Sequence, residues 1–215
     1  MVTEAARWGN AFIAAGLKRG DRIPFFLDDT PVYPAAFFGA VRAGFVPVLL
    51  NTQTTADVLN FFLQDTGAKI ALCEAALARR FEGEALHGTT LERVVIVNGA
   101  ADGEGRIAAA DFLAGQPDTL DCADTGARGH GLLDVFLGAR RGRPKGIVHL
   151  HHDMAYTQAS FGKHALKLTE DDICFSVPKI FFAYGFGNAL TFPFSIGATT
   201  LLMPGPAEGL TRAWT

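Results

Sequence analysis

The chain has 215 residues, of which 49% are hydrophobic and 19% are charged. This composition excludes a disordered or collagen-like polypeptide and fits one or two globular domains of roughly 100 to 200 residues each. The formal net charge of −3 provides no global attraction to nucleic acid or to an anionic membrane, and no apolar run approaches the roughly 20 residues of a membrane helix. Three cysteines lie far apart without metal-ligand spacing, and this odd count suits a reducing compartment better than a disulfide framework. We therefore expect a cytoplasmic protein with neither nucleic acid nor membrane as partner.

Helical and strand-like segments alternate along the first half of the chain. Apolar residues spaced three and four apart predict helices, and short continuous apolar runs predict strands buried on both faces. In chain order we expect helices over 3–15, 33–43, 56–64, 75–81 and 107–113, and strands over 22–27, 45–50, 69–73 and 94–97. This alternation predicts an α/β architecture with a mostly parallel sheet flanked by helices.

A Gly- and Asp-rich connector over 115–131 leads into a second group of elements. An apolar run over 132–137 and a basic, glycine-rich turn over 138–146 come first. After them we expect strands over 147–150, 173–177 and 199–203 and helices over 153–166 and 184–196. We divide the chain into a first α/β part (1–125), a connector with the basic turn (126–146) and a second α/β part (147–215).

The clearest local indication of chemistry is the turn Gly142-Arg143-Pro144-Lys145-Gly146. Glycines let backbone N–H groups approach a polyphosphate closely, and a lysine can neutralise one of its oxygens. The turn lacks the Lys-Ser/Thr end of a Walker-type loop. Taken alone, it is better explained as a solvated basic loop.

The sequence from Gly142 to Gly205 closely resembles benzoate-CoA ligases, members of the adenylate-forming superfamily. The resemblance extends over 22–52, where Pro34-Ala35-Ala36-Phe37 is similar to the early core of the family, and the stretch 181–193 favours the aryl-CoA branch. It implies a partial N-terminal core of the adenylate-forming fold. It also implies an AMP-forming ligase that activates benzoate or a related aromatic carboxylate with ATP and Mg²⁺ and transfers the acyl group to CoA.

The resemblance assigns site residues one by one. It implies that Gly142, Lys145 and Gly146 belong to the loop that clamps the β and γ phosphates of ATP. It implies that the aromatic acid pocket is walled by Ala183, Tyr184 and Gly185. For the neighbouring Phe181 and Phe182, packing into the core at a helix N-terminus is the favoured interpretation.

Three histidines suggest a metal site at first sight: His149, His151 and His152. On a strand, the first two would face the same side. No carboxylate or cysteine set completes a tetrahedral site, so we expect no metal ligand here and instead packing or supporting roles.

The phosphate loop departs from the family pattern. The family carries Ser and Thr hydroxyls where this chain has none over 136–142. Synonymous codons for Gly129 to Arg143 can be chosen so that a shifted frame restores Ser and Thr, and we hypothesise a frame-shift artefact that makes 129–141 foreign to the fold.

The family's later motifs and its C-terminal domain with the catalytic lysine have no counterpart in the sequence. We therefore expect an N-terminal fragment that has no catalytic residue of its own, is inactive alone and binds ATP, Mg²⁺ and CoA weakly. The alternative is a noncatalytic remnant that binds an aromatic acid or a partner subunit. The preferred acid and the oligomeric state stay open.

Overall fold

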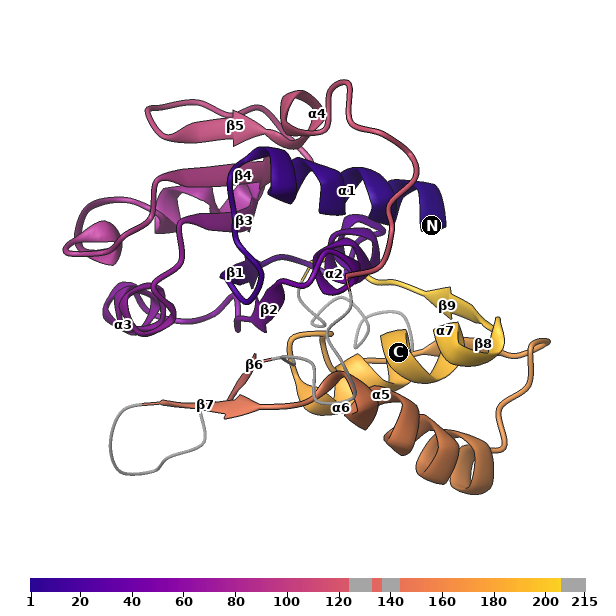
Figure 1. Cartoon of the computed structure of the whole chain (residues 1–215). Coiled ribbons are helices and arrows are strands. Elements are labelled where there is room, and N and C mark those ends of the chain that lie inside the picture. The colour runs from indigo at the N-terminus through magenta and orange to yellow at the C-terminus, as the bar shows by residue number, and fades with distance from the viewer. Residues whose placement is uncertain (124–132, 137–143, 206–215) are drawn as a thin grey trace.

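The computed structural model describes residues 1–123 and 144–205, and the backbone of 133–136 (Figure 1). Its main sheet has the strand order β5-β4-β3-β1-β2-β6-β7. All neighbouring strands in it are parallel except β6 and β7, which are antiparallel. The strand bounds are β1 Arg22–Phe26, β2 Val46–Leu49, β3 Ile70–Glu74, β4 Arg93–Val97, β5 Arg106–Ala108, β6 Leu133–Phe136 and β7 Lys145–Val148.

Helices cover both faces of this sheet, as the continuous apolar strands require. Helices α1 (Val2–Ala14) and α2 (Val32–Arg42) pack on one face, and α3 (Ala56–Thr66) packs on the other with the 3₁₀ turns η1 (Ala75–Arg80) and η2 (Gly83–Leu86). Successive residues of β1 point to opposite faces, so Phe25 joins the α1–α2 core and Phe26 the α3 core. Each buried phenylalanine contributes about 1.5–3 kcal/mol.

Helices α1 and α2 approach closely because two glycines face each other. A Cβ on Gly39 would lie 2.8 Å from Cβ of Trp8, and a Cβ on Gly9 would lie 2.8 Å from the carbonyl oxygen of Gly39. Only the missing side chains leave room for this contact. The close approach buries Trp8 and Phe12 against the sheet.

The second group of elements packs below the sheet, in orange and yellow in Figure 1. It contains α5 (His151–Thr157), which continues as the π-helix η3 (Gln158–Leu166), and the parallel strands β8 (Ile173–Phe175) and β9 (Thr199–Leu201). Helix α6 (Ala183–Gly185), the π-helix η4 (Phe186–Thr191) and α7 (Phe192–Ile196) follow one another without a break. Ile180 and Leu190 belong to the same core as α1 and α2.

The expected α/β architecture with a mostly parallel sheet is confirmed. The helix expected over 107–113 is wrong at its start, because residues 106–108 pair with β4 as strand β5, and α4 is confined to Ala109–Phe112. The segment after β3 is 3₁₀ rather than α-helical. Strand β6, from the expected connector, and β7, which begins in the connector's last two residues, extend the first sheet. The domain division itself stays a prediction.

Candidate functional site

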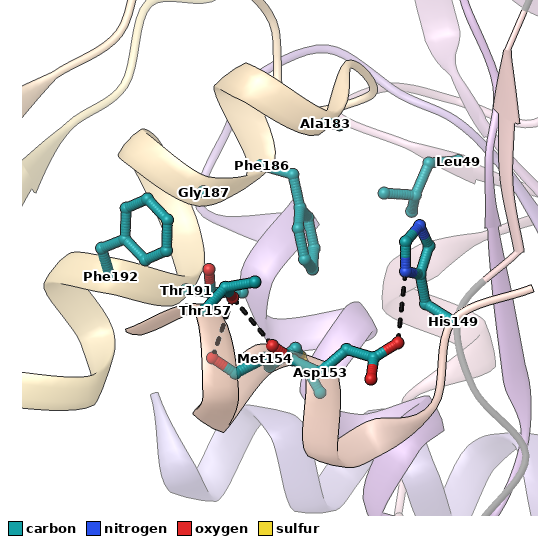
Figure 2. Close-up of a pocket in the computed structure, with 10 residues that line it drawn as sticks. All are labelled: Leu49, His149, Asp153, Met154, Thr157, Ala183, Phe186, Gly187, Thr191 and Phe192. Atoms are coloured by element: carbon teal, nitrogen blue, oxygen red, sulfur yellow. Dashed lines mark hydrogen bonds and ion pairs between the residues drawn. The ribbon is translucent and has the colours of Figure 1, made fainter. Parts of the chain in front are cut away.

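An apolar pocket of about 150 Å³ lies where the end of β2, the start of α5 and the α6–η4 segment meet (Figure 2). A cavity of about this size, when lined by apolar side chains, holds a benzene ring. Apolar and aromatic side chains make up most of the wall, with polar groups on its α5 side. The lining residues are Leu49, His149, Asp153, Met154, Thr157, Ala183, Phe186, Gly187, Thr191 and Phe192.

The aromatic wall is fixed by the packing of η4. The ring of Phe186 packs edge-on against Phe37 of α2, with centroids 5.2 Å apart. A Cβ on Gly187 would lie 2.8 Å from Cε2 of Phe192, so glycine allows that ring to lie against the helix. Figure 2 shows Phe186 between His149 on one side and Phe192 on the other.

The polar wall comes from the start of α5. Asp153 accepts a hydrogen bond from the backbone N–H of Leu150 at 3.0 Å, which caps the first turn of the helix. The same oxygen, Oδ2, lies 3.3 Å from Nδ1 of His149, and Oδ1 lies 3.0 Å from Nε2 of His152. The Leu150 N–H, above all, holds the pKa of Asp153 below its usual value, with the two histidines acting in the same direction. Asp153 is therefore an ionised carboxylate at neutral pH.

Buried and partly buried contacts to the residues that follow β1 hold the segment that carries the aromatic wall. The carboxylate of Asp29 accepts a hydrogen bond from the N–H of Ile180 at 3.1 Å, and Asp28 accepts one from the N–H of Gly205 at 3.0 Å. Nζ of Lys179 lies 3.8 Å from Asp28. These contacts join residues more than 150 positions apart in the chain. They fix the turn that precedes Ala183.

Three residues were expected to wall the acid pocket. Of these, only Ala183 lines the pocket shown in Figure 2. Tyr184 is 67% exposed and lines a separate, open hollow beside β8. Gly185 is buried against the carbonyl oxygens of Pro178 and Lys179, where a Cβ would collide with both. The role of all three in acid binding stays a prediction. Phe181 is buried as expected, whereas Phe182 is 43% exposed.

The expected phosphate loop is only partly within the described residues. Gly142 lies outside them. Lys145 and Gly146 form the first two residues of β7, so the expected turn ends earlier than Gly146. They lie opposite Phe136 and Val135 of β6, and both are exposed. The expected turn is shorter because the pairing with β6 extends strand β7 towards its N-terminus, to Lys145.

The three histidines do not lie on one strand. Strand β7 ends at Val148, so His149 follows it while His151 and His152 begin α5, and the expected strand to Leu150 is wrong. Within the described ranges, no group of three or more histidine, cysteine, aspartate or glutamate side chains could hold a metal ion. The pairing of His149 with Asp153 was missed, although their i,i+4 spacing at a helix start was visible.

Comparison with protein families matches residues 1–128 and 141–215 to the family described as "AMP-binding enzyme". The unmatched residues, 129–140, fall within the stretch expected to be foreign to the fold. Helices long and apolar enough to cross a membrane are absent from the part of the chain that the structure describes.

Curated relatives include a benzoate-CoA ligase from Thauera aromatica, which is 35% identical over 92% of this chain and 37% of its own length. A 4-hydroxybenzoate-CoA/benzoate-CoA ligase from Rhodopseudomonas palustris is 34% identical over 93% of this chain and 36% of its own length. The chain therefore spans little more than a third of the length of these relatives.

Solved structures include an anthranilate-CoA ligase in complex with anthranoyl-AMP, which superimposes with a TM-score of 0.92 at 29% identity. That match covers 99% of this chain and 40% of the ligase. A benzoate-CoA ligase from Burkholderia xenovorans matches with a TM-score of 0.83 at 30% identity, over 94% of this chain and 39% of the ligase. The fold of this chain is thus part of the fold of these ligases.

Proposed function

The chain belongs to the AMP-binding enzyme family, and we propose that it forms the aromatic-acid-binding part of an AMP-forming aryl-CoA ligase. The observation that carries the proposal is the apolar pocket, whose volume of about 150 Å³ matches a single aromatic ring. Phe186 and Phe192 supply apolar surface for the faces of such a ring. The α5 side supplies the few polar groups that orient a bound ligand.

The chemistry of the proposed whole enzyme begins with a carboxylate, which is a poor electrophile. When bound, ATP with Mg²⁺ supplies the group that makes the carboxylate oxygen a good leaving group, and CoA then takes the acyl group. This chain's own residues hold the ring and exclude water from it. The exposed Lys145 and Gly146 on β7 are the described residues that we propose for phosphate contact.

A noncatalytic acid-binding role is the second candidate. It is favoured by the absence of Ser and Thr over 136–142 and by the unmatched stretch 129–140. Benzoate-dependent exchange between ATP and pyrophosphate by this chain would exclude the noncatalytic role. We expect none from the 215-residue chain, since its loop sequence offers no hydroxyl to the phosphates. The three free cysteines suit a reducing compartment, so a cytoplasmic location remains part of the proposal.

The test of the acid pocket is benzoate binding to the 215-residue chain, measured by ligand-observed NMR. The variant Ala183→Phe places a ring at the pocket, and we expect benzoate binding to fall at least about tenfold. Met154→Ala removes a flexible side chain from the wall, and we expect it to improve binding of 2-naphthoate relative to benzoate.

The control is Ala114→Phe, a matched substitution at an exposed position outside the pocket. Tyr184→Ala tests the alternative location in the hollow beside β8. If benzoate bound equally well to Ala183→Phe and lost affinity with Tyr184→Ala, the acid would occupy that hollow and our placement of the pocket would be wrong.

A further inference from the structure

One wall of the pocket carries a polar edge that an unsubstituted benzene ring cannot use. His149 lines the pocket, and its Nδ1 lies 3.3 Å from the carboxylate of Asp153. In Figure 2 the other ring nitrogen, Nε2, lies on the side of Leu49, away from Asp153. Among the residues that the structure describes, none hydrogen-bonds this nitrogen.

The partner of Nδ1 determines which nitrogen carries the proton. An ionised carboxylate only accepts hydrogen bonds, so Nδ1 must be the donor in this pair. In a neutral imidazole the proton is then on Nδ1, and Nε2 presents a lone pair. The carboxylate is itself held by the N–H of Leu150 at 3.0 Å, so the ring has a fixed partner and a fixed tautomer.

We propose that His149 is a specificity-determining residue, whose Nε2 accepts a hydrogen bond from a hydroxyl or amino group on the ring of the bound aromatic acid. Asp153 acts through it as a positioning residue. The inference rests on the proposed function, because it concerns the same pocket. It names the substrate class: aromatic acids with a hydrogen-bond donor on the ring, in preference to benzoate or to acids that carry only an acceptor there.

The experiment compares dissociation constants of benzoate, the three hydroxybenzoate isomers and the matching methoxybenzoates for the 215-residue chain at pH 8. Methoxy groups keep the oxygen but have no proton to donate, so they separate hydrogen bonding from ring polarity. We expect at least one hydroxybenzoate to bind about 3- to 10-fold more tightly than benzoate and than its methoxy counterpart.

Four variants test whether the preference for hydroxybenzoate depends on His149 and Asp153. With His149→Leu and Asp153→Ala, the ratio of the benzoate to the hydroxybenzoate dissociation constant should fall towards one. Asp153→Asn should retain the preference, since the N–H of Leu150 keeps the amide oxygen at the Oδ2 position beside Nδ1. His152→Leu is the matched control, because His152 contacts Oδ1 of the same aspartate but does not line the pocket.

Each outcome decides the inference. Benzoate binding without any preference for a hydroxyl overturns the role of His149 and leaves the proposed function standing. A preference for the hydroxyl that survives His149→Leu also overturns the role of His149, whatever the effect of His152→Leu. If no aromatic acid binds the folded chain, the proposed function and this inference both fail.

Discussion

Asp29 places a carboxyl group inside the contact between the first sheet and the segment that leads to the pocket. Its exposed fraction is only 3%, and it accepts a hydrogen bond from the N–H of Ile180. Burial raises the pKa of Asp29 from its ordinary value of 3.8 to about 6, and the negative charge of Asp28 acts in the same direction. The hydrogen bond from Ile180 and the charge of Lys179 offset only part of this increase.

The raised pKa makes stability depend on pH with a definite sign. The folded chain binds the Asp29 proton more tightly than the unfolded chain, so this stabilisation is fully present below about pH 4 and is lost as the pH rises through about 6. A difference of about two pKa units corresponds to about 3 kcal/mol in the free energy of unfolding. Glu74, whose pKa is also raised by burial, contributes with the same sign.

The variant Asp29→Asn isolates this contribution. Its amide oxygen can still accept the hydrogen bond from Ile180, but it has no charge to bury. Urea unfolding at several pH values between 4 and 7.5, followed through the fluorescence of buried Trp8, gives the free energy of unfolding of both proteins. We expect the variant to gain about 2–3 kcal/mol relative to the parent chain between pH 4 and pH 7.

Parallel pH curves for the two proteins would show that the burial of Asp29 does not perturb its titration. An opposite trend, with the parent gaining stability over the variant as the pH rises, would mean that Lys179 outweighs burial and lowers the pKa. Either result would refute the reasoning. Because only the difference between two chains is used, the titration of groups far from Asp29 cancels.

Two further predictions concern packing and reactivity. Gly39→Ala should lower the free energy of unfolding by about 1–3 kcal/mol, because its Cβ would lie 2.8 Å from that of Trp8. The control Gly162→Ala meets only contacts of 3.5 Å and should change stability far less, and equal losses in urea unfolding would contradict this account. Burial raises the pKa of Cys73 to about 12, so iodoacetamide should label exposed Cys122 in the native chain and Cys73 only after unfolding. Rapid native labelling of Cys73, measured by mass spectrometry, would show that β3 opens readily.

The sheet could be predicted because its strands have a local signature. Runs such as residues 45–50 and 94–97 are apolar at every position, as strands covered on both faces must be, and they became β2 and β4. Strand β5 lacked this signature, since Arg106–Ala108 is short, partly exposed and forms through pairing with β4. Edge pairing is a long-range effect that local spacing does not encode.

Which residues line the pocket is likewise decided by contacts that local sequence spacing does not encode. The resemblance groups Ala183, Tyr184 and Gly185 as one wall. Of these three, Ala183 lines the pocket in Figure 2, because successive residues of a helical turn point in different directions. For His149, placed on a strand, the sequence argued against a metal ligand and favoured a packing or supporting role. The decisive fact was that Asp153 caps α5 at Leu150, which ends the strand early and brings a carboxylate to Nδ1 of His149. A capping carboxylate four residues after a histidine can therefore indicate an oriented imidazole, and the structure decides whether that imidazole faces a pocket.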